Sequence, residues 1–187
     1  MFETLRNHIE KILPLTDQEF TFISSLFDSK SYKKGQFLFQ EGENLSRHYF
    51  VCKGLLKLIY TDSEAREHIV SFAMEDWWES DFEAFYLQQK TSMSLICIEN
   101  TDVLYITYDN FKHLCRTLPK IEHFFLEKAF FGCIAAQKRI LSTLTSNTKE
   151  RYTQLILRYP TLAQRVPKSQ LAAYLGVSRE TLSRFTL

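Results

Sequence analysis

The chain has 187 residues, of which 45% are hydrophobic and 24% are charged. These proportions are typical of a folded globular protein, and the length allows one large or two small domains. No apolar run approaches the roughly 20 residues of a membrane helix. The opening segment MFETLRNHIEKIL carries acidic residues at helical spacing, unlike a signal peptide. We therefore expect a cytoplasmic protein that is neither secreted nor held in a membrane.

The cysteines and histidines do not form a metal-binding pattern. Cys52, Cys97, Cys115 and Cys133 are at least 18 residues apart, so no pair has the spacing of a zinc or iron–sulfur site. The five histidines include no HxH pair of the kind that metal-binding cupins need. We expect free thiols, no metal and no other cofactor.

The net charge of +1 conceals an uneven distribution along the chain. Residues 1–139 hold 16 Lys or Arg against 20 Asp or Glu, a net −4, whereas residues 140–187 hold 7 against 2, a net +5. The basic C-terminal part is therefore the candidate for contact with a polyanion such as DNA.

The first elements in chain order are two short helices. Leu5 and Ile9 are one helical turn apart, and Thr16 with Glu19 forms a capping-box pattern before apolar residues that run from Phe20 to Phe27. From about residue 35 the pattern changes to short strands, expected at 36–39, 49–52, 55–60, 69–72, 94–99 and 103–106. They are rich in Phe, Tyr, Val and Ile and are separated by turn residues, which predicts a small all-β roll or barrel.

Helical spacing returns after residue 109. A short helix is expected before Pro119, followed by a long helix from about 120 to 144. The long helix is apolar on more than one side, which favours a core helix or, more strongly, a homodimer through this helix. The polar run 142–148 predicts a hinge before the basic C-terminal part.

The most informative segment is 168–187, which has the pattern of a helix-turn-helix. Leu171 and Leu175 lie on one face of a first helix, Gly176 suits a left-handed turn, and Ser178 suits the start of a second helix over 178–187. Leu182 is expected to face inward and anchor the second helix by packing against the first.

Outward positions of this segment carry residue types that bind DNA. The candidates are Ser178, Arg179, Glu180, Ser183 and Arg184 on the second helix, with Lys168 and Ser169 at the start of the first. Arg can contact guanine bidentately and Glu can accept from cytosine. Lys149, Arg151, Arg165 and Lys168 are candidates for phosphate contacts. The alternative is a plain helical corner whose charged residues form a solvated face.

Over nearly its whole length the chain resembles the Crp/Fnr family of transcription regulators. The resemblance rests on the glycine-marked segments GQFLFQEGE (35–43) and VCKGLLKL (51–58) and on GVSRETLSR (176–184). It implies an α+β protein in three parts. These are a cyclic-nucleotide-binding-like β-roll sensor domain at 1–118 (a double-stranded β-helix or jelly roll), a dimerisation helix at 119–145, and a winged helix-turn-helix DNA-binding domain at 146–187. The implied partners are double-stranded DNA, a second copy of the chain and an unidentified small-molecule effector.

One departure from the family concerns the effector. Cyclic-AMP-responsive members carry a Gly-Glu pair and, about ten residues later, Arg followed by Ser or Thr. Here the corresponding region, 74–85, has no glycine and five acidic residues, and Lys90-Thr91 stands where Arg-Ser is expected. Acidic residues repel a phosphate, and Lys cannot bind it bidentately, so we expect that cyclic AMP does not control the protein. The run is interpreted either as a solvated loop with a short helix that starts around Ser80, or as a retuned pocket whose ligand contacts are Trp77, Trp78, Glu79, Lys90 and Thr91.

The leading hypothesis is therefore a homodimeric DNA-binding regulator. The alternative is a small-molecule-binding β-roll module with a degenerate DNA-binding end, because the sequence stops two residues after Phe185. An enzyme is not expected, since no nucleophile elbow, phosphate loop or HExxH motif is present in the sequence.

Overall fold

The computed structural model describes residues 1–185 in two units, Met1–Leu126 and a second that begins at Glu127. Among the described residues, no helix is both long and apolar enough to cross a bilayer. Each unit is considered separately below.

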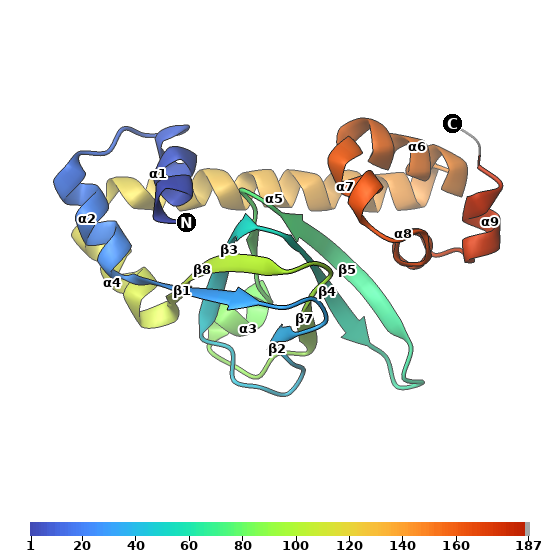
Figure 1. Cartoon of the computed structure of the whole chain (residues 1–187), viewed down its shortest axis with the longest axis horizontal. Helices are drawn as coiled ribbons and strands as arrows, with labels where there is room; N and C mark the ends of the chain where they lie inside the picture. The colour runs from blue at the N-terminus through green and yellow to red at the C-terminus, as the bar shows by residue number, and fades with distance from the viewer. Residues whose placement is uncertain (186–187) are drawn as a thin grey trace. The chain divides into compact units, whose positions relative to one another are not determined.

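The first unit contains two antiparallel sheets of four strands each (Figure 1). The strands of one sheet are, in spatial order, β1 (Phe27–Tyr32), β8 (Thr101–Thr107), β3 (Arg47–Lys53) and β6 (Trp78–Glu79). Those of the other are β2 (Phe37–Phe39), β7 (Met93–Cys97), β4 (Leu55–Thr61) and β5 (Glu67–Met74). The predicted β-roll is thereby confirmed, with β1 and β6 as additional strands.

The two sheets enclose an inner core. Side chains alternate between the two faces of each strand, so that every second residue can belong instead to an outer core beneath the helices. On β3, Tyr49 and Val51 belong to the inner core between the sheets, whereas Phe50 belongs to the outer core beneath the helices. On β8, Val103 faces inward and Leu104 outward. This two-residue period is what a sheet covered on both faces requires.

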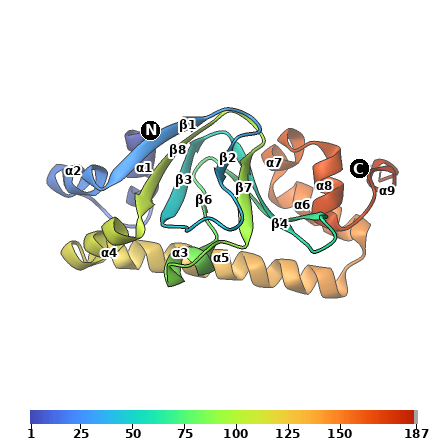
Figure 2. The ribbon, with the colours of Figure 1, turned by 90° about the horizontal axis from the view of Figure 1, so that it is seen from below.

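Helices at both ends of the first unit supply the outer core. These are α1 (Phe2–Glu10), α2 (Asp17–Ser25), α4 (Tyr108–Thr117) and the first turns of α5 (Lys120–Thr145). Figure 2 shows α1 and α2 beside β1 and β8. The predicted capping box is present, since the Glu19 backbone N–H donates to Thr16 Oγ1 (3.2 Å) and the Glu19 carboxylate accepts from the Thr16 backbone N–H (2.8 Å). Phe27, expected on the second helix, instead begins β1.

The second unit consists of helices. After the remainder of α5 come α6 (Thr148–Arg158), α7 (Pro160–Arg165), α8 (Lys168–Leu175) and α9 (Arg179–Ser183). The expected hinge at 142–148 is wrong in extent, because α5 continues to Thr145 and α6 begins at Thr148. The hydroxyls of Thr143 and Thr145 donate to carbonyls four residues earlier, which lets these polar residues stay helical.

Two expectations about the end of the chain need correction. The second helix of the predicted helix-turn-helix was expected over 178–187, but α9 ends at Ser183 and Arg184 is its C-cap. Positions 186 and 187 of that expectation lie outside the described residues. The wing implied by the resemblance is not found either, because residues 127–185 contain no strand.

Candidate functional site

The α8–α9 pair is fixed by a short turn whose chemistry follows the sequence. Gly176 caps α8 with φ at +71°, a left-handed conformation that glycine adopts without strain. The Val177 backbone N–H donates to Ala172 O (3.0 Å), and Ser178 caps α9 by accepting from the Thr181 backbone N–H (3.2 Å). Leu182 is buried. The turn and its two anchors therefore set the direction of α9 relative to α8.

All five predicted contact residues of the second helix are exposed: Ser178, Arg179, Glu180, Ser183 and Arg184. Lys168 and Ser169 are exposed at the start of α8. Hydrogen bonds from its own backbone N–H and from Ser178 lower the pKa of Glu180, so its carboxylate is ionised at neutral pH. The exposed face of α9 thus presents guanidinium donors, a carboxylate acceptor and a hydroxyl.

Arg151 has a different environment from the one predicted. Its guanidinium donates to Ser146 O (3.0 Å) and, from the other nitrogen, to Leu175 O (3.0 Å) at the end of α8. These bonds join the start of α6 to the end of α8. Arg151 therefore joins α6 to the end of α8, and its predicted contact with a phosphate stays a prediction.

In the first unit, the two tryptophans predicted to contact a ligand pack against the hydrophobic cores. Trp78 packs in the outer core, with ring centroids 5.1 Å from Phe50 and 5.4 Å from Phe125, and its Nε1–H donates to His8 Nε2 (3.3 Å). Trp77 is half-buried against the inner core. The two side chains lie against different cores and do not form one ligand-binding wall.

Glu79 is buried, with 5% of its surface exposed. Its Oε2 accepts from the Ser71 hydroxyl (2.6 Å) and its Oε1 accepts from the Ser80 backbone N–H (3.0 Å). Burial raises the pKa of Glu79 from 4.5 to about 7, against the opposing effect of these two donors. Near neutral pH this carboxyl is therefore about half protonated.

Thr91 is tied to the start of α3 (Phe82–Leu87). Its hydroxyl donates to Asp81 Oδ2 (2.8 Å), and Asp81 Oδ1 caps α3 by accepting from the Ala84 backbone N–H (3.1 Å). Both Thr91 and Asp81 are buried, whereas Lys90 is exposed. The interpretation of the acidic run as solvated is wrong at Glu79 and Asp81, because each carboxyl is buried and accepts hydrogen bonds from specific donors. The short helix expected to start near Ser80 is confirmed by α3, whose N-cap is Asp81.

His48, on β3, has one of the most strongly shifted pKa values of the roll. It is 8% exposed and lies 4.9 Å from Trp78 and 5.4 Å from Phe82 and from Phe85, measured between ring centroids. Burial lowers the pKa of His48 to about 3, so the ring is neutral at physiological pH. A lone histidine on a strand gives no sequence signal for such surroundings. The described residues contain no group of three His, Cys, Asp or Glu side chains placed to hold a metal.

The comparisons agree with this architecture. Residues 29–118 match the family model of the cyclic nucleotide-binding domain. The catabolite activator protein of Thermus thermophilus has 22% sequence identity and a TM-score of 0.59, with 92% of this chain and 83% of that chain covered. FixK2 of Bradyrhizobium japonicum has 17% identity and a TM-score of 0.74, with 85% and 82% covered.

A third solved structure is the c-di-GMP responsive global regulator CLP of Xanthomonas campestris, with 15% identity, a TM-score of 0.70, and 91% and 89% covered. No curated protein matches the chain in sequence. At these identities the structural likeness shows the fold alone. Residues 29–118 therefore resemble the cyclic nucleotide-binding domain, and the fold of the chain is similar to that of these three solved proteins.

Proposed function

We propose that the chain is a DNA-binding transcription regulator of the Crp/Fnr type, which acts as a homodimer on a palindromic site. The observation that carries this proposal is the exposed face of α9. Arg179, Glu180 and Arg184 lie on a helix end that Ser178 caps and that the buried Leu182 anchors. These side chains need a partner with both donors and acceptors on its surface, which the major groove of DNA offers.

The chemistry of each side chain supports a division of roles. Arg179 and Arg184 would donate bidentately to guanine, each contributing about 1–3 kcal/mol of discrimination, and Glu180 would accept from cytosine. Lys168 and Ser169 at the start of α8 would contact phosphates. The +5 charge of residues 140–187 supports the same partner.

The exposed side of α5 supports the homodimer. Within the second unit, Phe130, Ile134, Leu141 and Leu144 are between 41% and 77% exposed. They recur at spacings of three, four and seven residues, which places them on one stripe of the helix. A second copy of α5 would cover this stripe and place two α9 helices about one turn of DNA, ~34 Å, apart.

The surroundings of Glu79 and Thr91 support an effector other than cyclic AMP. Region 74–85 has no glycine whose backbone could approach a phosphate closely, and the buried Glu79 and Asp81 carboxyls lie in the same region. Lys90 offers a single exposed ammonium in place of a guanidinium. Calorimetry is expected to give no binding of cyclic AMP or cyclic GMP at low micromolar concentration, and a dissociation constant in that range would contradict this part of the proposal.

The arginine substitutions test the proposal directly. Arg179→Ala and Arg184→Ala are expected to abolish the preference for a DNA sequence selected by the wild-type protein from a random duplex pool. Arg158→Ala, which removes an exposed arginine from α6, is the matched control and should retain the preference. If both α9 variants keep the wild-type preference, the assigned contacts are wrong.

The alternative function is a small-molecule-binding β-roll module that no longer binds DNA. The buried, hydrogen-bonded groups of the first unit favour a well-defined sensor domain, whatever the role of α9. This alternative predicts that no duplex binds even at low salt, whereas a regulator retains nonspecific binding there.

A further inference from the structure

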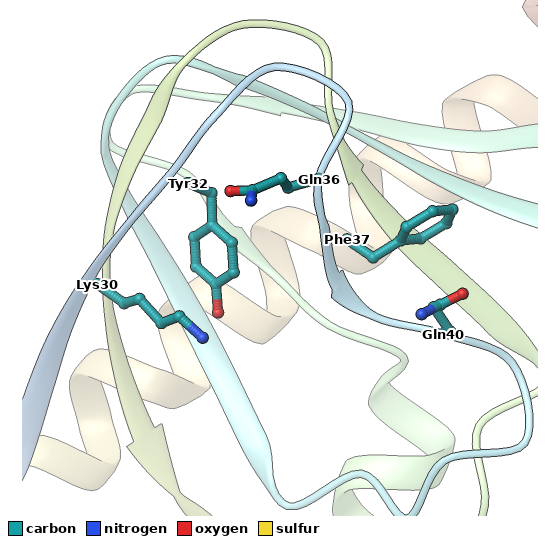
Figure 3. Close-up of a pocket in the computed structure, with 5 residues that line it drawn as sticks. All are labelled: Lys30, Tyr32, Gln36, Phe37 and Gln40. Carbon is teal, nitrogen blue, oxygen red and sulfur yellow. The ribbon is translucent and has the colours of Figure 1, made fainter.

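A hollow of about 360 Å³ lies on the surface of the first unit, between β1 and the segment around β2. Figure 3 shows its lining, which consists of Lys30, Tyr32, Gln36, Phe37 and Gln40. The Tyr32 hydroxyl is buried out of reach of a molecule in this hollow, and the other four side chains are exposed. A binding site needs polar groups that its ligand can reach. The second unit contains a more specific arrangement, which concerns the candidate DNA-binding helices.

A contact between two side chains joins α5 to the end of α8. The Arg139 guanidinium of α5 lies 4.1 Å from the centroid of the Tyr174 ring of α8. A cation over the face of an aromatic ring is attracted by the negative charge of that face. Both side chains are half-buried, and such contacts are stronger there than at fully exposed positions. Burial raises the pKa of Tyr174, against the opposing effect of the Arg139 charge, so the phenol is neutral at physiological pH.

A second arginine holds the same end of α8. The Arg151 guanidinium of α6 donates to Leu175 O (3.0 Å), in the residue that follows Tyr174. Gly176 then forms the turn that leads into α9. The end of α8, from which the direction of α9 follows, is therefore held by one guanidinium from α6 and one from α5. Arg139 is the one that ties it to α5.

Arg139 lies farther from the turn between α5 and α6 than the hydrogen bonds that join these two helices. The Ser142 hydroxyl donates to Gln154 Oε1 (2.7 Å), and Ser142 is only four residues before Ser146. Arg139 is seven residues before Ser146, or about 10 Å along the helix. A contact at this distance from the turn has a longer lever arm, so it resists a change in the angle between α5 and the following helices.

The contact is made on the side of α5 that faces away from the apolar stripe. At about 100° per residue, Arg139 lies about 140–180° around the helix from each residue of the stripe, which are Phe130, Ile134, Leu141 and Leu144. In the proposed dimer, one side of α5 would meet the second copy while the opposite side holds α8. The distance between the two α9 helices would then depend on the Arg139–Tyr174 contact in each copy.

We propose that Arg139 is a positioning residue that sets the spacing between the two half-sites that the dimer binds. This inference rests on the proposed function and adds a determinant of spacing to it. One base pair changes the separation of two half-sites by about 3.4 Å and their relative rotation by about 35°. A dimer whose α9 helices are held firmly to α5 accepts one spacing, whereas a dimer that lacks the contact accepts neighbouring spacings as well.

The test measures the affinity of the purified full chain for duplexes with two half-sites, selected by the wild type, whose spacing varies in steps of one base pair. A duplex with one half-site and a scrambled second half-site is measured beside them. The wild type is expected to bind best at one spacing. In Arg139→Gln the preference for that spacing over its neighbours should fall about tenfold, while the affinity for the single half-site is retained.

Further variants assign the effect to the contact itself. Tyr174→Leu removes the aromatic face but stays apolar, and it should reduce the preference as much as Arg139→Gln. The double variant should fall no further than either single one, because both remove the same contact. Arg139→Lys keeps a cation near the ring and should recover part of the preference. Lys138→Gln removes a charge from the next, exposed position of the helix and should keep the wild-type preference.

The outcomes separate this inference from the proposed function. Wild-type spacing preference in both Arg139→Gln and Tyr174→Leu would overturn the inference and leave the proposed regulator intact. An equal loss of affinity for the single half-site would overturn it as well, because the contact would then only maintain the fold of the helix pair. A wild-type protein that prefers no spacing would contradict the proposed homodimer and the inference with it.

Discussion

The Ser71 hydroxyl on β5 donates a 2.6 Å hydrogen bond to Oε2 of Glu79, which lies in the acidic segment 74–85. Glu79 is buried, and the Ser80 backbone N–H occupies its other oxygen. A carboxylate that accepts hydrogen bonds from the protein has no donor to offer a phosphate and repels its negative charge. Burial raises the pKa of Glu79 to about 7, so this carboxyl titrates near neutral pH in the folded chain.

The first prediction concerns the pH dependence of stability. The pKa of Glu79 rises on folding from 4.5 to about 7, so the folded chain retains a proton that the unfolded chain has lost. The stabilisation that comes from this retained proton is fully present below pH 4.5. The free energy of unfolding then falls by about 3 kcal/mol as the pH rises to about 7. In Glu79→Gln the amide keeps the geometry of the protonated acid and this loss disappears. Urea denaturation across this interval measures both slopes, and equal slopes would contradict the assignment.

The second prediction concerns the buried contact between Thr91 and Asp81. Thr91→Val removes the hydroxyl that donates to Asp81 Oδ2 and leaves a buried carboxylate with fewer donors. The expected loss in the free energy of unfolding is about 1–3 kcal/mol. Thr91→Ser keeps the hydroxyl and should lose less. If valine is tolerated as well as serine, the contact does not stabilise the start of α3.

The third prediction concerns Gly54, which lies between β3 and β4. Its φ is +109°, and a Cβ there would clash with Thr101 Oγ1 and lie 2.7 Å from Asn100 O. Gly54→Ala is therefore expected to destabilise the roll by about 3 kcal/mol.

Gly132, inside α5, is the matched control for Gly54. A Cβ at Gly132 meets nothing within 4 Å. Gly132→Ala should therefore stabilise the helix by about 0.5–1 kcal/mol. Thermal denaturation followed by circular dichroism compares the two variants, and a similar effect of both would contradict the role of Gly54.

The fourth prediction concerns the apolar stripe of α5. Phe130→Glu places a charge on the stripe, and the variant is expected to be monomeric in light scattering at concentrations where the wild type is dimeric. Ala136→Glu introduces the same residue at an exposed position of α5 off the stripe, two residues from Ile134, and should remain dimeric. A dimeric Phe130→Glu protein would mean that another surface joins the copies.

Strong local patterns predicted most of the elements. Each of these patterns is specified by residues only a few positions apart in the sequence. Examples are the strands rich in Phe, Val and Ile, the Thr16 capping box and the Gly176 turn. β1 was missed because four of its six residues, Asp28 to Ser31, are polar and have low strand propensity. Its pairing with β8, 69 to 79 residues away, compensates for that weakness.

The candidate sites were predicted unevenly for a similar reason. The α9 residues were identified because capping and turn chemistry place them on one exposed face. The burial of Glu79 and Asp81 was not foreseen, because their partners Ser71, on β5, and Thr91, before β7, lie 8 and 10 residues away. An acidic run has the same appearance in a sequence whether it is solvated or buried on donors.

The measurement that tests the central claim most directly is fluorescence anisotropy of the purified protein with duplex DNA from upstream of its own coding sequence. The titration runs from about 50 to about 200 mM salt, beside a scrambled duplex of the same length and composition. The account predicts tighter binding to the upstream duplex and an affinity that falls steeply with salt. Equal affinity for both duplexes, or no binding at the lowest salt, would contradict the assignment of α9 as a DNA-reading helix.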